Sequence, residues 1–397
     1  MAVTTGAQPA LDPHDFLAID ALLDDEEKAI RDTVRQFVRE QIVPEVGDWF
    51  ERGVLPREVI GELAKLGLFG MHLHGYGLPG ASAVSYGLTC LELEAGDSGV
   101  RSAVSVQGSL AMFSIWKWGS EEQKQRWLPP MARLDKIGAF ALTEPEHGSD
   151  SVALETSARR DGESYVINGN KKWIGNGSIA DVVVVWARDT TDNAVKGFLV
   201  EKGTPGYHAT VMTGKASLRA VWQAEINFEE MRVPAENRLP GANSFKDCAR
   251  VLTGTRMACA WMALGHAVAG FDVALTYAKR RKQFGKSLAS FQIIQQRLVK
   301  MLAEVTAMQL YCMQIAKLDA AGKLHPTLAG LAKMHNTSKA RQLLSDARDL
   351  LGGNGILLDF HVIRHMVDLE SIHTFEGTET IQTLIVGRDI TGIAAFK

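Results

Sequence analysis

Apolar residues recur with a helical period along the first third of the chain. Five of them are spaced three and four residues apart, at Ile30, Val34, Phe37, Val38 and Ile42. This spacing puts them on one face of a helix. The carboxylates of Asp24 and Asp25 can cap the start of that helix, and Pro44 ends it. The helical pattern continues to about residue 136 and predicts an N-terminal helical domain over residues 1–138.

The pattern changes near Gly138, where short runs rich in β-branched and aromatic residues begin. Dipeptides typical of turns, Asp161-Gly162 and Asn168-Gly169, bound the first of these runs. The strand candidates are residues 165–167, 182–186, 197–200 and 225–228. We therefore predict a β-barrel-like middle domain over residues 139–243.

The helical period returns after Ser244 and continues to the end of the chain. One long stripe consists of Ile294, Leu298, Met301, Leu302, Val305 and Met308. Gly322 interrupts the pattern, and a further helix from Thr327 to Leu351 is expected to end at Gly352-Gly353. Long antiparallel helices of this kind favour a four-helix bundle over residues 244–397. The predicted fold class is therefore α+β, in three domains.

Charge and composition exclude several classes of partner. A formal net charge of −3 gives no electrostatic reason to expect binding to nucleic acid or to an anionic membrane. We found no apolar run near the roughly 20 residues that a membrane-spanning helix needs. Residues 1–15 lack the charged and apolar regions of a secretory signal. We therefore expect a soluble, cytoplasmic protein without membrane insertion.

The cysteine and histidine residues show no spacing typical of a metal site or a disulfide framework. The four cysteines, Cys90, Cys248, Cys259 and Cys312, contain no C-x-x-C pair, so we interpret them as reduced and mostly buried. His72 and His74 share a short stretch without further candidate ligands nearby. No metal site is expected.

Five stretches of sequence resemble the acyl-CoA dehydrogenase family in their order and spacing. They are residues 142–150, 172–174, 281–285, 351–355 and 375–378. The resemblance covers nearly the whole chain and implies the three domains described above, FAD bound between the β domain and the C-terminal bundle, and a homotetramer. Residues 97–107 and 361–365 are most similar to glutaryl-CoA dehydrogenases. Residues 172–176 and 391–397 also resemble plant peroxisomal short-chain acyl-CoA oxidases.

The resemblance assigns the catalytic base to Glu376. Removal of the proton α to a thioester needs a base close to that carbon, with a pKa tuned by a dry site. The alternative is a glutamate that only complements the dipole of a helix beginning near Glu379. In a minority of the family the base precedes the arginine of the long bundle helix. That position is Thr255 here, before Arg256, and a threonine cannot serve; Arg256 is expected at the substrate.

The same resemblance implies a set of cofactor contacts. Residues expected at the flavin ring are Phe140, Leu142, Thr143, Trp173 and Ile174, with Thr378 as a contact just after the base. Ser149 is expected near the phosphates of the CoA substrate or the flavin. Residues expected to reach the FAD of a neighbouring subunit or its adenosine half are Arg281, Gln283, Phe284, Gly352 and Gly353. The alternatives are a core role for Trp173 and a solvated helix end for residues 279–282.

Arg101 decides the predicted substrate. A cation at the end of an acyl pocket is costly to bury without an anionic partner, and the free carboxylate of a glutaryl chain supplies one. Ser105, one helical turn on, can donate to the same carboxylate. The alternative is an arginine that pairs with Glu92, Glu94 or Asp97 outside the pocket.

These residues predict the oxidation of glutaryl-CoA, followed by decarboxylation to crotonyl-CoA, as in lysine and tryptophan degradation. Electrons are expected to pass to an electron-transfer flavoprotein. The alternative is a short-chain acyl-CoA dehydrogenase or oxidase of fatty acid metabolism that acts on uncharged acyl groups. Three positions keep it open. Gly175 replaces a threonine expected to hydrogen-bond flavin N5, and Val100 and Phe375 replace tyrosines expected in glutaryl-CoA dehydrogenases.

Overall fold

Helices form the first third of the chain in the computed structural model, which describes residues 11–395. They are α1 (Asp25–Phe37), α2 (Val46–Arg52), α3 (Arg57–Lys65), α4 (Ala83–Gly96), α5 (Ser98–Val104), α6 (Phe113–Trp118) and α7 (Glu121–Ala132). Stretches of π-helix follow α1 (η2, Val38–Ile42) and α5 (η3, Ser105–Met112). Asp24 caps α1 through a reciprocal capping box with Glu27, as its sequence predicts.

A seven-stranded sheet makes up the middle of the chain. Its strands are β3 (Gly138–Ala141), β4 (Ser157–Asp161), β5 (Ser164–Gly175), β6 (Val182–Asp189), β7 (Val195–Glu201), β8 (Tyr207–Val211) and β9 (Gln223–Pro234). The order is β3-β6-β4-β5-β9-β8, and β7 pairs with β6. The four strand candidates lie within β5, β6, β7 and β9 and are confirmed. The pattern missed β3, β4 and β8.

Five helices form the rest of the described chain. They are α8 (Phe245–Arg280), α9 (Gln292–Ala320), α10 (Pro326–Leu350), α11 (Val362–Thr374) and α12 (Glu379–Thr391). A small hairpin, β10 (Lys282–Gln283) and β11 (Lys286–Ser287), connects α8 to α9. The expected glycine end of α10 continues as a 3-10 turn, η7 (Gly352–Ile356). The resemblance at residues 391–397 extends two residues beyond the described part of the chain.

Helix α8 runs through the centre of the molecule and holds the domains together. Its length and composition would allow it to cross a membrane, but most of its apolar window is buried inside the protein, which is the environment of a core helix. It packs against α4, α9 and α10. All four cysteines are buried and free, as expected. A second, smaller pair of strands, β1 (His74–Gly75) and β2 (Leu78–Pro79), lies in the N-terminal part.

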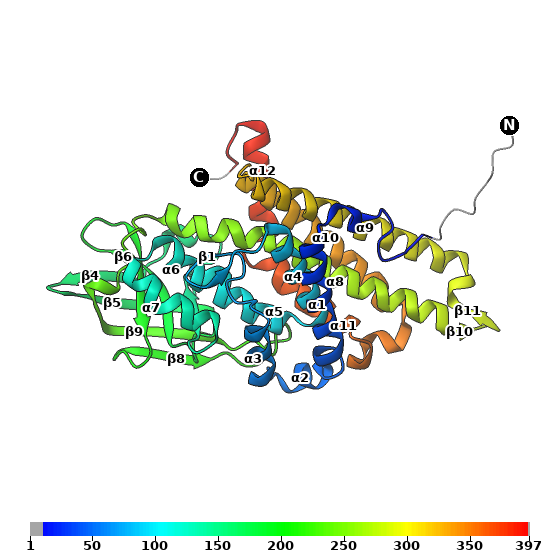
Figure 1. Ribbon diagram of the computed structural model, residues 1–397, viewed down its shortest axis with the longest axis horizontal. Helices are drawn as coiled ribbons and strands as arrows, with labels where there is room; N and C mark the ends of the chain where they lie inside the picture. The colour runs from blue at the N-terminus through cyan, green and yellow to red at the C-terminus, as the bar shows by residue number, and fades with distance from the viewer. Residues whose placement is uncertain (1–10, 396–397) are drawn as a thin grey trace.

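The molecule is elongated, with the sheet and the β10–β11 hairpin at opposite ends (Figure 1). The sheet has a core of its own, built from the inward faces of β3 to β9. The helices share one larger core that continues into the other face of the sheet. The α+β fold class, with helical, β and helical parts in this order, is confirmed.

Candidate active site

Glu376 lies in the turn between α11 and α12 and has a strained backbone. Its φ is +57°, in the left-handed region that side-chain-bearing residues rarely adopt, and Gly377 follows with φ +88°. Such strain persists where the surrounding structure holds it, and it concentrates at functional sites. Here Gln382 Nε2 donates to the Glu376 carbonyl over 2.9 Å and Arg256 Nε donates to it over 3.3 Å.

The environment of the Glu376 carboxylate suits a base. Thr255 Oγ1 donates to Oε2 over 2.7 Å. Burial raises the pKa of Glu376 above its ordinary value, while Thr255 and the cations Arg256, Lys333 and Arg101 pull it down. A carboxylate balanced in this way has more basicity than one in water and remains ionisable.

The helix-dipole role proposed as the alternative for Glu376 does not fit this position. Thr378 is the N-cap of α12, and its side chain accepts a hydrogen bond from the Ile381 backbone N–H. The acidic residue of the first turn is Glu379, whereas Glu376 precedes the cap. Thr378, predicted as a cofactor contact, thus also fixes the start of the helix that follows the base.

Arg101 is buried in α5, with 4% of its surface exposed. Its Nε donates to Glu94 Oε2 over 2.6 Å, and its Nη2 donates to Ser102 Oγ over 2.9 Å. Of the three carboxylates considered as partners, Glu94 is the one that binds it; Glu92 pairs with Arg35 and Asp97 with Arg364. Arg101 therefore has the carboxylate partner that the alternative predicts.

Ser102 is the serine that hydrogen-bonds to Arg101, and the contact of Ser105 with a substrate carboxylate stays a prediction. Ser105 is the first residue of the π-helical stretch η3 and is 8% exposed. The Asp97 side chain accepts from the backbone N–H groups of Gly99 and Val100, at 2.7 and 3.1 Å. This cap starts α5 and so fixes where Arg101 lies.

Glu94 connects Arg101 to a buried polar network that the sequence did not indicate. Its Oε1 lies 3.0 Å from His266 Nε2 and also accepts from Ser98. His266 Nδ1 lies 2.8 Å from His365 Nδ1, and His365 Nε2 lies 3.3 Å from Arg364 Nη2. Because Arg364 can only donate, each neutral imidazole accepts on the Arg364 side and donates toward Glu94.

The charge state of this network follows from its contacts. Burial alone disfavours the charged form of Glu94, yet Arg101 and His266 hold the pKa of its carboxyl at about 2. Burial and Arg364 hold the pKa of His365 well below its usual range. Arg101 and Glu94 therefore form an ion pair, and the His365 imidazole further along the network is neutral.

The residues predicted at the flavin ring lie on the edge strand β3, in the loop after it and at the end of the central strand β5. Phe140, Leu142 and Ile174 are buried, and the Thr143 carbonyl accepts from the Lys172 N–H over 2.8 Å. Trp173 is 52% exposed with φ +66°, so its core alternative is wrong. Ser149 is exposed in the loop that follows.

The residues predicted to reach a neighbour's cofactor lie at the other end of the molecule. Arg281, Gln283 and Phe284 are exposed at the β10–β11 hairpin, opposite the sheet in Figure 1. Phe284 is 92% exposed with φ +52°. Gly352 and Gly353 have open space where a Cβ would stand. Asn354 Nδ2 donates to the Tyr277 hydroxyl over 3.1 Å, which ties this turn to the same end of α8.

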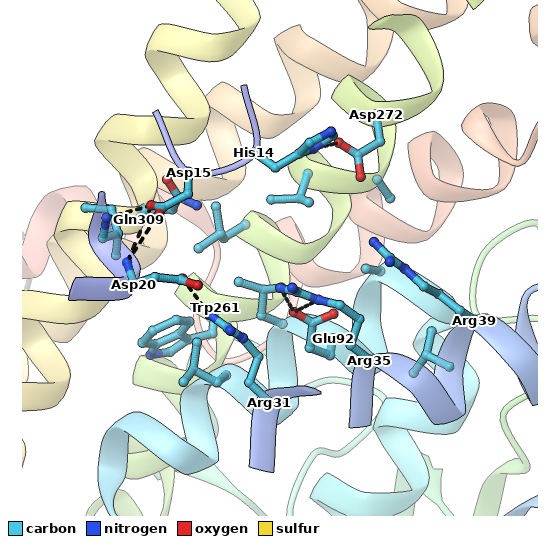
Figure 2. Close-up of a pocket in the computed structure, with 18 of the residues that line it drawn as sticks. His14, Asp15, Asp20, Arg31, Arg35, Arg39, Glu92, Trp261, Asp272 and Gln309 are labelled. Atoms are coloured by element: carbon cyan, nitrogen blue, oxygen red, sulfur yellow. Dashed lines mark hydrogen bonds and ion pairs between the residues drawn. The ribbon is translucent and has the colours of Figure 1, made fainter. Parts of the chain in front are cut away.

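A cavity of about 340 Å³ lies apart from all these residues. Residues 12–23, α1, α4, α8 and α9 line it, and Figure 2 shows its charged side chains, among them Arg35 paired with Glu92. Neither Glu376 nor Arg101 belongs to its lining, although the outer members of the Glu94 network, His365 and Arg364, do. Within residues 11–395, no group of three or more His, Cys, Asp or Glu side chains is placed to hold a metal ion.

The residues of β3, of the loop after it and of the end of β5 fit the flavin that the sequence resemblance implies. Trp173 offers an exposed aromatic face, which a buried structural tryptophan would not. A Cβ on Gly175 would lie 2.9 Å from Val106 Cγ2, so this strand end carries no side chain toward η3. Phe140, Leu142, Thr143 and Trp173 would hold the ring of the cofactor, which accepts hydride when bound.

Comparison with known proteins identifies the family. The models of the acyl-CoA dehydrogenase N-terminal, middle and C-terminal domains match residues 24–135, 139–231 and 245–391. A glutaryl-CoA dehydrogenase from Mycobacterium smegmatis, in complex with FADH2, has a TM-score of 0.95 and 43% identity, with 98% of this chain and 100% of that chain covered. Butyryl-CoA dehydrogenase from Megasphaera elsdenii has a TM-score of 0.89 and 32% identity, with coverages of 93% and 98%. The short-chain specific acyl-CoA dehydrogenase of Clostridium acetobutylicum is 34% identical over 372 residues, which are 92% of this chain and 98% of that protein. The chain belongs to the acyl-CoA dehydrogenase family, whose members bind FAD.

Proposed function

We propose that this acyl-CoA dehydrogenase oxidises glutaryl-CoA and releases CO2 to give crotonyl-CoA. The observation that carries the proposal is Arg101, a buried guanidinium that uses two of its nitrogens, Nε and Nη2, on Glu94 and Ser102. An uncharged acyl chain gains nothing from such a cation, whereas a terminal carboxylate can form two hydrogen bonds with it.

Glu376 performs both proton transfers of the proposed reaction. Its carboxylate removes a proton from the α-carbon, and bound FAD supplies the acceptor for the hydride that leaves the β-carbon. The resulting unsaturated acyl chain loses its terminal carboxylate as CO2, and the electron pair of that bond passes into a dienolate. Protonated Glu376 then returns its proton to the γ-carbon. Glu376 therefore returns the proton that it removed, and the reaction needs no second acid.

Two further features support a dicarboxylate substrate. The similarity to a glutaryl-CoA dehydrogenase, at 43% identity, exceeds the 32% and 34% found with the butyryl-CoA and short-chain enzymes. Arg101 also has a spare donor capacity, because Glu94 and Ser102 occupy its Nε and Nη2 while a guanidinium carries five N–H groups. We further propose an electron-transfer flavoprotein as the electron acceptor and a homotetramer as the assembly.

A short-chain enzyme for uncharged acyl groups is the second candidate. It is favoured by the ion pair itself, since Glu94 already neutralises Arg101 and removes the need for an anionic substrate. Gly175 lacks the hydroxyl of the threonine expected at this position, as in the oxidase-like relatives. This candidate therefore includes an oxidase as well as a dehydrogenase.

The experiment that separates the candidates must keep the buried charges balanced. Arg101→Gln alone would leave Glu94 as an unpaired buried carboxylate, and removing one partner of such a pair costs about 3–5 kcal/mol of stability. We therefore choose Arg101→Gln/Glu94→Gln. The matched control is Arg35→Gln/Glu92→Gln, which removes both members of another ion pair of α4. Anaerobic bleaching of the flavin by glutaryl-CoA and by butyryl-CoA is measured, together with the CO2 released.

The proposal expects kcat/KM for glutaryl-CoA to fall by about two orders of magnitude or more in the double variant, because a lost buried ionic contact costs about 2–5 kcal/mol. Bleaching by butyryl-CoA should change little. Equal losses for both substrates, or wild-type bleaching by butyryl-CoA alone, would assign the enzyme to the short-chain candidate.

A further inference from the structure

Lys333 is a buried lysine in the apolar side of α10. It is 1% exposed, and the buried residues around it on the helix are Ala329, Asn336 and Ala340. Lysine is almost never fully buried without compensation, because the ammonium loses its hydration. Within residues 11–395, no carboxylate lies within ion-pair distance of its Nζ. Its partners must therefore be found elsewhere.

The partners are carbonyl oxygens on both sides of the catalytic base. Nζ donates to the Phe375 carbonyl over 2.5 Å, to the Gly377 carbonyl, and to the His373 carbonyl over 3.5 Å. An ammonium has three N–H donors, so this set uses all of them. The carbonyl between them, that of Glu376, accepts from Gln382 and Arg256 instead.

The conformation of the 375–377 turn explains why it needs these hydrogen bonds from Lys333. Glu376 and Gly377 have φ values of +57° and +88°, and a Cβ on Gly377 would meet Gln382 Nε2 at 2.4 Å. The backbone therefore has positive φ at two consecutive residues, which is unfavourable for Glu376 and accessible to Gly377. Lys333 Nζ binds the carbonyl oxygens of Phe375 and Gly377, the residues before and after Glu376. These two hydrogen bonds restrict the backbone on both sides of Glu376 and so the direction of the Glu376 side chain.

We propose that Lys333 is the positioning residue of the catalytic base: its ammonium holds the 375–377 turn in the conformation that presents Glu376 to the substrate, and from beyond ion-pair distance its charge favours the ionised carboxylate. The inference concerns proton abstraction and is independent of which acyl-CoA the enzyme prefers.

The surrounding charges agree with this role. Burial raises the pKa of Glu376, and Lys333 is one of the cations that oppose the rise. The other charged or titratable groups near the pair are Arg256, Cys248 and Cys259 on α8, Arg101 on α5 and His373 on α11, which itself pairs with Glu379. Burial lowers the pKa of Lys333, against the pull of Cys259 and Glu376. Neutralising Lys333 leaves the base with less compensation for its burial.

The test is Lys333→Met, which keeps the length of the side chain and removes its charge and donors. The matched control is Lys339→Met on the same helix, where the lysine is half-exposed and pairs with Glu304 over 3.2 Å. Two rates are followed across pH. One is anaerobic flavin reduction by butyryl-CoA. The other is exchange of the α-proton of 3-thiabutyryl-CoA in D2O, in which sulfur replaces the β-carbon and no hydride can leave.

Lys333→Met is expected to lower both rates by about a hundredfold at neutral pH, since small displacements of a catalytic group have effects of this size. The acid limb of the pH profile should also move to higher pH, while FAD content stays that of the wild type. Lys339→Met should change neither rate.

A role limited to stability predicts a different result. The rate per bound flavin and the acid limb would then coincide with those of the wild type, and this outcome would overturn the proposal. If Lys333→Met does not fold, Lys333→Gln replaces it, because an amide retains donors for the turn but no charge. With this variant the proposal requires the shifted acid limb with a smaller loss of rate; an unshifted limb refutes it.

Discussion

The Glu376 turn and the β10–β11 hairpin surround their functional residues in opposite ways. At the base, the carbonyls and carboxylate of the Glu376 turn have partners on α8, α10 and α12 of the same chain. At the β10–β11 hairpin, Arg281, Gln283 and Phe284 extend from the surface, and Phe284 is 92% exposed. Within its own chain the Phe284 ring meets the Phe291 ring edge-to-face, at 6.2 Å between centroids, and the rest of its apolar surface faces solvent, as at an interaction site.

The difference shows which part of the site one chain can complete. The seven-stranded sheet and the β10–β11 hairpin lie at opposite ends of the long axis (Figure 1). This supports the proposal that a neighbouring copy supplies the hairpin, and that proton abstraction is organised by one chain while cofactor binding is shared.

Complementation between two inactive variants would break or establish this division. Glu376→Gln removes the base and should lower flavin reduction by about 10⁴-fold, the upper range for a general base. Arg281→Glu/Phe284→Ser should instead lose FAD, because it spoils the hairpin and leaves Glu376 intact. When the two variants are refolded together, about a quarter of the sites would combine an intact base with a neighbour's intact hairpin, for random pairing in a symmetric assembly.

The measurement is specific activity after mixing and added FAD, beside each variant refolded alone. Recovery toward about a quarter of the wild-type activity requires a site shared between copies. If mixing restores no activity while each variant still assembles, the hairpin serves its own chain. The division between the Glu376 turn and the β10–β11 hairpin is then wrong.

The sequence predicts this molecule best where periodicity or a local motif determines the structure. The stripe from Ile294 to Met308 lies on α9, and the Asp24 cap begins α1, because both depend on residues a few positions apart. Strands β3 and β8 were missed because short strands depend on their neighbours in the sheet more than on their own composition.

The candidate site was predictable in part for the same reason. The resemblance gave Glu376 and Arg101, but the groups that set their properties come from distant segments. His266 lies 172 positions after Glu94 in the chain yet 3.0 Å from it in space. Lys333 did leave a signal, since it occupies an apolar-stripe position between Ala329 and Ala340. A charged residue at such a position indicates either a buried partner or an error in the predicted face.

Gly175 tests how closely the sheet end is packed. Its φ is not in the left-handed region, so threonine is acceptable to the strand backbone, but a Cβ there would lie 2.9 Å from Val106 Cγ2. Gly175→Thr is therefore expected to lower the free energy of unfolding by about 1–3 kcal/mol, as overpacking does. Chemical unfolding curves measure this change.

Val106→Ala in the same chain should restore most of the lost stability by removing the methyl groups that threonine meets. If the double variant is no more stable than Gly175→Thr alone, the cost lies in the strand itself, and the sheet end is less rigid than the base region.

The smallest effect is expected at Asp368, which joins the sheet to the helix that leads to the base. Asp368 lies on α11, and its Oδ1 accepts from the Leu218 backbone N–H over 2.7 Å. Burial, together with the nearby Asp97, raises the pKa of Asp368 to about 8, against the pull of Arg364. The folded protein thus keeps a proton that the unfolded chain releases near its ordinary pKa of 3.8. Between these two values the unfolded chain binds fewer protons, so stability falls as pH rises.

Asp368→Asn retains the acceptor oxygen and cannot ionise, so its melting temperature should equal that of the wild type near pH 4 and exceed it increasingly toward pH 8. Asp192 is the opposing control, because hydrogen bonds from Lys196 lower its pKa, and Asp192→Asn should lose stability relative to the wild type as pH rises. Parallel melting curves for Asp368→Asn and the wild type at every pH would show that Asp368 is ionised in the folded protein and that the junction carries a buried charge.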